Sequence, residues 1–175
     1  MNDVAQRAQF ETIYAEHAGQ VYRFALRLSG SREEAEDLAA ESLAEAFRQW
    51  EKFRGTATPR SWLFAIVLNR WRMKRRQRRI SVVSMEMAED IASTFQFPNL
   101  ELAQALAKLP ESLRIAFLLV KGESLTHAEA AKALGIPVGT VYFRVHVAIR
   151  KLRAELDPNP RTIAPTIEVT CDPEL

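Results

Sequence analysis

One stretch of the sequence, residues 60–79, combines the side chains that hold single-stranded nucleic acid. It carries eight Lys or Arg and no acid, which gives a net charge of +8. Trp62, Phe64 and Trp71 accompany these cations, and the segment FRGTATP (53–59) comes directly before them. Cations follow a phosphate backbone while aromatic rings stack on bases, so this combination predicts binding to a nucleic acid strand.

Two other interpretations of residues 60–79 stay open. The three aromatic side chains can belong to a hydrophobic core, and for Trp62 we favour that interpretation. A basic helix lying on a membrane needs apolar and basic side chains on opposite faces. Here the apolar half comes before the basic half, which favours nucleic acid.

A second stretch, residues 126–145, has the spacing of a helix-turn-helix. Ala131 leaves room for two helices to cross, Gly135 suits a turn that needs positive φ, and Val141 is an apolar plug between the helices. The alternative is a generic helical hairpin with Gly at its corner. Agreement with the flanking helices favours the helix-turn-helix.

The second helix of such a unit presents its first residues to base edges in the major groove. Arg144 is suited to guanine, and Arg150 and Lys151 to phosphates. Phe143 can lie against a thymine methyl group, and Tyr142 can hydrogen-bond a phosphate. Burial of Tyr142, Phe143 and Val147 against a neighbouring helix or the linker is a second interpretation. A protein partner covering this face is a third.

Helical periodicity positions both stretches, and alternating strand character is missing before the tail. Capping boxes at Ser31–Glu34 and Thr126–Glu129 each open a helix. We expect helices over residues 10–28, 31–53, 60–79, 100–109, 111–121, 126–134 and 138–156. The predicted fold is all-α, with two small helical domains (1–79 and 100–156) joined by a flexible acidic linker (80–99). Residues 157–175 contain four prolines and are expected to be extended or disordered.

Composition excludes several classes of protein. The net charge of +2 over 175 residues conceals blocks of opposite sign, which indicates an anionic partner for the +8 block. No apolar run reaches the roughly 18 residues of a membrane helix, and no secretory signal is visible. The single Cys171 forms no internal disulfide. The scattered histidines (His17, His127, His146) and the lack of a Gly-rich phosphate loop argue against an enzyme, a cofactor or a metal site. A cytoplasmic protein is expected.

Two segments resemble a known family in this order and with an acidic stretch between them. EEAEDLAAESLAEAFRQWEKFRGTATPRSWLFAIVLNRWRMKRR is similar to the first conserved domain of bacterial sigma factors of the extracytoplasmic-function (ECF) type, in the sigma-70 family. LPESLRIAFLLVKGESLTHAEAAKALGIPVGTVYFRVHVAIRKLR resembles their second domain. The resemblance covers about residues 10–79 and 102–156.

The resemblance implies a dissociable subunit of RNA polymerase that recognises promoter DNA in double- and single-stranded form. Residues implied to dock on core polymerase are Asp37, Leu38 and Glu41. Residues implied to capture the melted minus-ten element are Arg60, Trp62, Asn69, Arg70, Arg72, Lys74 and Arg75. Residues implied to read the minus-thirty-five element are Thr140, Tyr142, Phe143, Arg144, His146 and Arg150. An anti-sigma factor is a further implied partner, and no membrane insertion is expected.

Five positions depart from the family pattern. Ala40 replaces a common Gln and Met73 a frequent Asp, while Tyr142-Phe143 replaces Lys-Ser and Val147 replaces Arg. The last two changes lower the cationic density of the reading helix. A stand-alone helix-turn-helix regulator and a sigma-like decoy that titrates an anti-sigma factor remain as alternative functions.

Overall fold

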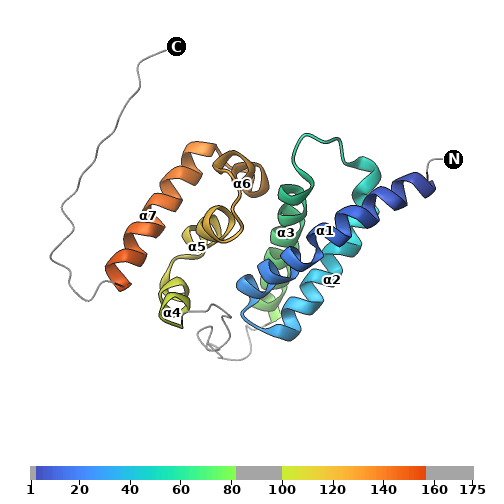
Figure 1. Ribbon diagram of the computed structural model, residues 1–175. Coiled ribbons are helices and arrows are strands. Elements are labelled where there is room, and N and C mark those ends of the chain that lie inside the picture. Colours follow the sequence, from blue (N-terminus) through green and yellow to red (C-terminus); the bar gives the residue numbers. More distant parts are fainter. Residues whose placement is uncertain (1–2, 82–99, 157–175) are drawn as a thin grey trace, which may run out of the picture.

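The first two helices form an antiparallel hairpin. The computed structural model describes residues 3–81 and 100–156, and helix α1 (Asp3–Ser29) packs along α2 (Arg32–Gln49) (Figure 1). Gly30 turns the chain with a φ of 75°, a conformation that glycine adopts without strain. Ser31 caps α2, because its Oγ accepts a hydrogen bond from the Glu34 backbone N–H. The Glu34 carboxylate, however, pairs with Arg78 of the third helix instead of closing the predicted capping box.

The third helix begins one residue before its predicted start and ends two residues after its predicted end. Helix α2 is followed by a short 3-10 turn, η1 (Trp50–Lys52), and a loop leads to α3 (Pro59–Ser81). Thr58 is the N-cap of α3, since its Oγ1 accepts a hydrogen bond from the Ser61 backbone N–H at 3.3 Å. The first two residues of the predicted linker, 80 and 81, are therefore helical. Its remainder and the predicted tail lie outside the described residues.

Four further helical segments make up the second half of the chain. These are α4 (Leu100–Lys108), α5 (Glu111–Phe117) with its π-helical continuation η4 (Leu118–Gly122), α6 (His127–Leu134) and α7 (Val138–Leu156). The Thr126–Glu129 capping box is complete, with the Thr126 backbone N–H donating to Glu129 at 2.9 Å. Gly135 has a φ of 66° and ends α6. The predicted helix-turn-helix is confirmed in its local geometry.

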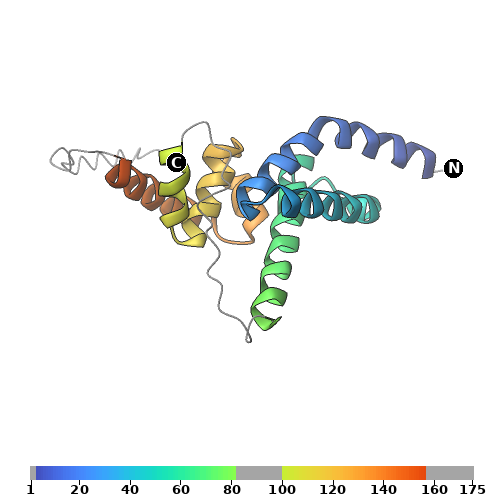
Figure 2. The same ribbon diagram turned by 90° about the horizontal axis from the view of Figure 1, so that it is seen from below.

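The two halves share one hydrophobic core. We call residues 3–81 the N-terminal module and residues 100–156 the C-terminal module. Helices α5 and α6 lie beside α1 and α3 (Figures 1 and 2). One cluster of buried side chains includes Phe24 and Phe64 from the first module together with Leu119 and Leu125 from the second. A smaller cluster around Leu106 joins α4 to α7. No helix within the described residues has the length and apolar character needed to cross a membrane.

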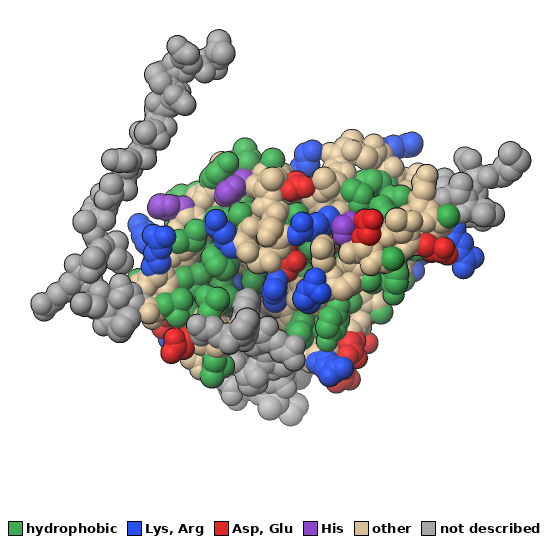
Figure 3. Space-filling view, viewed as in Figure 1, with side chains coloured by type: hydrophobic (Ala, Val, Ile, Leu, Met, Phe, Trp, Pro, Cys, Tyr) green, Lys and Arg blue, Asp and Glu red, His purple; other side chains and the backbone are tan. Residues whose placement is uncertain are grey.

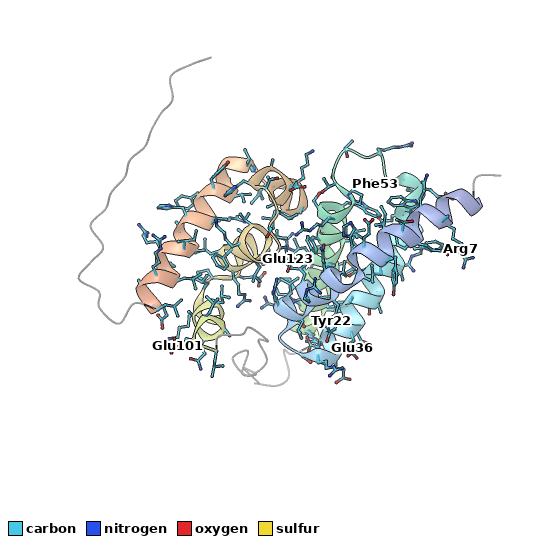
Figure 4. The ribbon with its side chains drawn as sticks, viewed as in Figure 1. Arg7, Tyr22, Glu36, Phe53, Glu101 and Glu123 are labelled. Atoms are coloured by element: carbon cyan, nitrogen blue, oxygen red, sulfur yellow. The ribbon has the colours of Figure 1, made fainter. Side chains whose placement is uncertain are left out.

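Polar contacts also join the N-terminal module to the C-terminal module. Arg27 of α1 donates to the Gly122 carbonyl oxygen at 3.2 Å and pairs with the Glu123 carboxylate. Glu123 is only 5% exposed and lies between the modules (Figure 4). Burial raises the pKa of the Glu123 carboxyl above its usual range, although the nearby Arg27 opposes the shift. A second ion pair, Arg75 with Glu111, joins α3 to α5.

We predict that Leu119→Ala destabilises the N-terminal module although the residue belongs to the other module. Leu119 is fully buried in the shared core, so its truncation should lower the free energy of unfolding by about 2–5 kcal/mol. The three tryptophans, Trp50, Trp62 and Trp71, all belong to the N-terminal module. Urea unfolding followed by tryptophan fluorescence therefore reports that module alone.

The matched control is Leu106→Ala, an equally buried leucine in the smaller cluster. It should shift the fluorescence midpoint less than Leu119→Ala does. An unchanged midpoint in Leu119→Ala would contradict a shared core.

Candidate nucleic-acid interface

A row of ion pairs joins α2 to α3. Arg70, Lys74 and Arg78 follow one another at every fourth position of α3, so they lie on one side of the helix. Arg70 donates to Glu45 at 2.7 Å, Lys74 to Glu41 at 2.8 Å and Arg78 to Glu34 at 2.6 Å. We call these three pairs the α2–α3 ladder. Much of the basic block is thus matched by carboxylates in this structure.

A second row of polar side chains on α3 faces solvent. Asn69, Arg72 and Arg76 are exposed and share one face, because they are spaced three and four residues apart. None of them makes a hydrogen bond or ion pair with another residue of the described segments. We call these residues the open row of α3. Within the predicted minus-ten set, Asn69 and Arg72 are therefore free to bind a ligand.

The aromatic side chains of α3 have structural roles. Phe64 and Trp71 are buried in the core, at 1% and 6% exposure. Trp62 is half-buried, with its ring 4.9 Å from that of Phe53 and 5.9 Å from that of Trp50. These contacts confirm the packing interpretation that we favoured for Trp62. They also join the end of α2 to the start of α3, and so fix both ends of the loop between them (Figure 4).

The C-terminal module holds the loop before α3. Lys132 of α6 donates to the Thr56 carbonyl oxygen at 2.7 Å, and the Thr58 hydroxyl donates to the Glu129 carboxylate at 2.9 Å. Hydrogen bonds from Thr126, with a smaller contribution from Thr58, lower the pKa of Glu129. Arg60 is half-buried at this junction, 5.7 Å from the centre of the Phe64 ring. Its Nε is buried without a hydrogen-bond partner in the described part of the chain.

The front of α7 is apolar at its start and basic farther along. Val141, Val145, Ala148 and Leu152 form the buried side. At about 100° per residue, Phe143 and Arg150 point directly away from that side, whereas Tyr142 and Arg144 lie on opposite flanks. Phe143 is 66% exposed and Tyr142 is 57% exposed. Of Tyr142, Phe143 and Val147, only Val147 packs against the smaller cluster, so the described residues leave Phe143 uncovered.

Arg144 lies less favourably than predicted. It is half-buried on the flank of α7, as is Thr140, while His146 and Arg150 are exposed. The helix turns by about 100° between neighbouring residues, so Arg144 does not share the front with Phe143. Figure 3 shows apolar and histidine side chains together over α6 and the start of α7.

Stacking between two rings fixes the position of Tyr142. Its ring lies 3.8 Å from the ring of His127, the first residue of α6, with an angle of 7° between their planes. This contact could not be predicted from the sequence, since the two residues are 15 positions apart on different helices.

The predicted polymerase-docking residues do not share one surface. Asp37 is exposed, and Glu41 pairs with Lys74 in the ladder. Leu38 is 1% exposed and packs in the core, so its side chain does not face outward with Asp37 in this arrangement. The reason is the helical period, which places Leu38 on the stripe shared with Ala35 and Ser42.

Comparison with known proteins agrees with this architecture. Residues 13–80 match the family Sigma-70 region 2, and residues 99–152 match Sigma-70, region 4. The chain belongs to the sigma-70 family. The ECF RNA polymerase sigma factor SigL of Mycobacterium tuberculosis is 34% identical over 161 residues, which are 87% of this chain and 91% of SigL.

Two solved structures are similar in fold. One is the sigma factor RpoE in complex with the anti-sigma factor NepR from Bartonella quintana, with a TM-score of 0.73 and 24% identity, covering 85% of this chain and 96% of RpoE. The other is CnrH in complex with the cytosolic domain of CnrY, with a TM-score of 0.67 and 26% identity, covering 86% and 89%. The predicted all-α fold with two helical domains is confirmed.

The family membership establishes the function at the level of the whole chain. This protein is an ECF sigma factor, which directs promoter recognition and transcription initiation by RNA polymerase. The sequence-based identification is confirmed, and the stand-alone regulator is set aside because region 2 is present.

We predict a low pKa for Glu45, the most strongly bound carboxylate of the ladder. Hydrogen bonds from Arg48, Gln49 and Arg70 lower its pKa from 4.5 to about 2. The stabilisation that results is fully present above the unfolded-state value of 4.5 and is lost as the pH falls toward 2. Side-chain carboxyl NMR titration should give a midpoint near 2 for Glu45.

The effect of the low Glu45 pKa on the free energy of unfolding can also be measured. Glu45→Gln does not titrate, so its free energy of unfolding should fall less steeply with acidification below pH 4.5. Glu51→Gln, which removes an exposed carboxylate outside the ladder, is the control variant. Equal slopes in wild type and Glu45→Gln would contradict the assignment.

Proposed function

We propose that the N-terminal module holds the melted minus-ten strand while α7 reads the minus-thirty-five duplex. The observation that carries this assignment is the open row of α3, which follows a loop whose ends are fixed by aromatic packing. A base flipped out of the duplex costs a few kcal/mol of unstacking, which nearby cations and a pocket must offset. Unpaired cations beside an exposed amide suit that task.

The residues of the proposed minus-ten site differ in whether they are exposed or already paired with a carboxylate. Asn69 and Arg72 are exposed, and Arg60 and Trp62 flank the loop. Arg70, Lys74 and Arg75 reach DNA only by leaving their carboxylate partners. We therefore assign the first contacts with the strand to Asn69 and Arg72.

For the minus-thirty-five element we propose contacts from the front of α7. Phe143, His146 and Arg150 face outward, with Tyr142 on one flank and Thr140 and Arg144 on the other. Arg150 is suited to phosphate, because it lies one to two turns beyond the residues that enter the groove. On α2, exposed Asp37 is the leading residue for docking on core polymerase, and buried Leu38 supports the helix from beneath.

The two modules separate when both elements are bound. Their names place the elements about 25 base pairs apart, or about 85 Å of B-form DNA. In the closed arrangement α3 and α6 are in contact. We further propose action in the cytoplasm as a non-enzymatic subunit, with an anti-sigma factor as the regulator implied by the family.

Run-off transcription with core RNA polymerase and a randomised promoter library tests the assignment. Active templates should share two sequence blocks at the spacing of a minus-ten and a minus-thirty-five element. Recovery of active templates that share only one block, or none, would contradict the division of labour between the modules.

We predict that the double variant Asn69→Ala with Arg72→Ala loses open-complex formation but still binds core polymerase. A hydrogen bond to a charged group is worth about 1.5–3 kcal/mol, so the pair should reduce promoter melting by about 100-fold or more. Permanganate footprinting of unpaired thymines measures melting, and fluorescence anisotropy measures binding to core.

Arg7→Ala with Gln9→Ala is the matched control, because it removes an exposed arginine and an exposed amide from α1. Melting at the wild-type level in the Asn69/Arg72 variant would reject the placement of the minus-ten site.

A further inference from the structure

The front of the first two turns of α7 is apolar, and the one cation of these turns, Arg144, is half-buried on the flank. We call Val138, Gly139, Tyr142 and Phe143 the reading tip. The three side chains are 44%, 57% and 66% exposed in that order. In a helix-turn-helix these first residues are the ones inserted deepest into the major groove. The cations of the front begin farther along, at Arg150.

The geometry of the reading tip favours contact with DNA over internal packing. A Cβ on Gly139 would meet nothing within 4 Å, so no neighbour in the fold requires a glycine there. Glycine inside a helix costs about 1 kcal/mol relative to alanine. Gly139 lies one turn before Phe143, and its bare backbone allows a base edge to approach the ring closely. The stack on His127 holds the Tyr142 ring beside this position.

The chemistry of the major groove leaves one partner for an apolar ring. Guanine, adenine and cytosine present hydrogen-bonding groups there, and thymine adds the C5-methyl group. A phenyl ring placed on a polar edge removes water without replacing its hydrogen bonds, which is unfavourable. A ring placed on a methyl group buries apolar area on both partners.

We propose that Phe143, supported by Tyr142, selects thymine in the minus-thirty-five element by contact with its 5-methyl group. This inference rests on the proposed role of α7 and names the base that its tip prefers. It differs from recognition by cations, because the preference comes from desolvation of a methyl group and not from a hydrogen bond.

Uracil in place of thymine removes only the methyl group and so tests the inference directly. The probe is a synthetic promoter duplex taken from the active library templates, with each minus-thirty-five thymine replaced in turn by uracil. The reconstituted holoenzyme should bind at least one uracil duplex about fourfold more weakly, the effect of one buried methyl group. At that position, 5-methylcytosine should be bound more tightly than cytosine.

Variants connect the methyl effect to the ring. Phe143→Ala should bind the thymine duplex about fourfold more weakly than wild type and should not distinguish thymine from uracil. Phe143→Leu keeps an apolar side chain and should retain part of the difference. Tyr14→Ala removes an aromatic side chain of similar exposure from α1 and should leave the difference unchanged.

Three results would overturn the inference. One is equal affinity of the wild-type holoenzyme for every thymine and uracil duplex. Another is an undiminished thymine–uracil difference in Phe143→Ala. The third is loss of transcription in Phe143→Ala without any methyl effect, which would assign the reading tip to a protein partner. Absence of initiation from all library templates would instead reject the proposed function itself.

Discussion

The apolar first half of α3 is buried on two sides at once, and this constraint determines most of the structure. Phe64 packs on Phe24 of α1 with ring centres 4.8 Å apart, while Val67 and Leu68 are fully buried. Helix α6 also packs against α3, so the polar side chains of the helix are left to its remaining sides. One row forms the α2–α3 ladder, Arg75 pairs with Glu111 of α5, and the open row faces solvent.

The α2–α3 ladder neutralises part of the positive charge of residues 60–79. A net charge of +8 suggests a strong field, yet Arg70, Lys74 and Arg78 each lie against a carboxylate of α2, and Arg75 lies against one of α5. Exposed ion pairs of this kind contribute little to stability individually, about 0–1 kcal/mol. Their main effect is to lower the positive potential and to hold the side chains in place. Phosphates would have to compete with these carboxylates, whereas the cations of the open row, Arg72 and Arg76, have no ion pair to break within the described segments.

The features that could be predicted from sequence depend on neighbours within about four residues. The Thr126 capping box and the turn at Gly135 are of this kind, and the family resemblance added the order of the two modules. The features that were missed join distant segments. Glu45 with Arg70, Arg27 with Glu123 and His127 with Tyr142 depend on how helices are placed against each other, which no periodicity encodes. The helical stripe of α2 predicts burial of Leu38, whereas the family motif implies a docking role for the same residue.

An apolar reading tip also affects which contacts give affinity for DNA and which give selectivity among bases. Cations bound to phosphates release counterions, so their contribution weakens as salt rises, whereas a methyl contact releases none. The front of α7 carries its cations only past the tip, from Arg150, so the proposed methyl contact would add selectivity without adding a phosphate contact at the tip. A weak module becomes effective when it is tethered beside other DNA contacts, because the tether raises its local concentration at the site. Joining this module to a polymerase through the N-terminal module supplies that tether, so a helix that would bind poorly alone can still select a promoter.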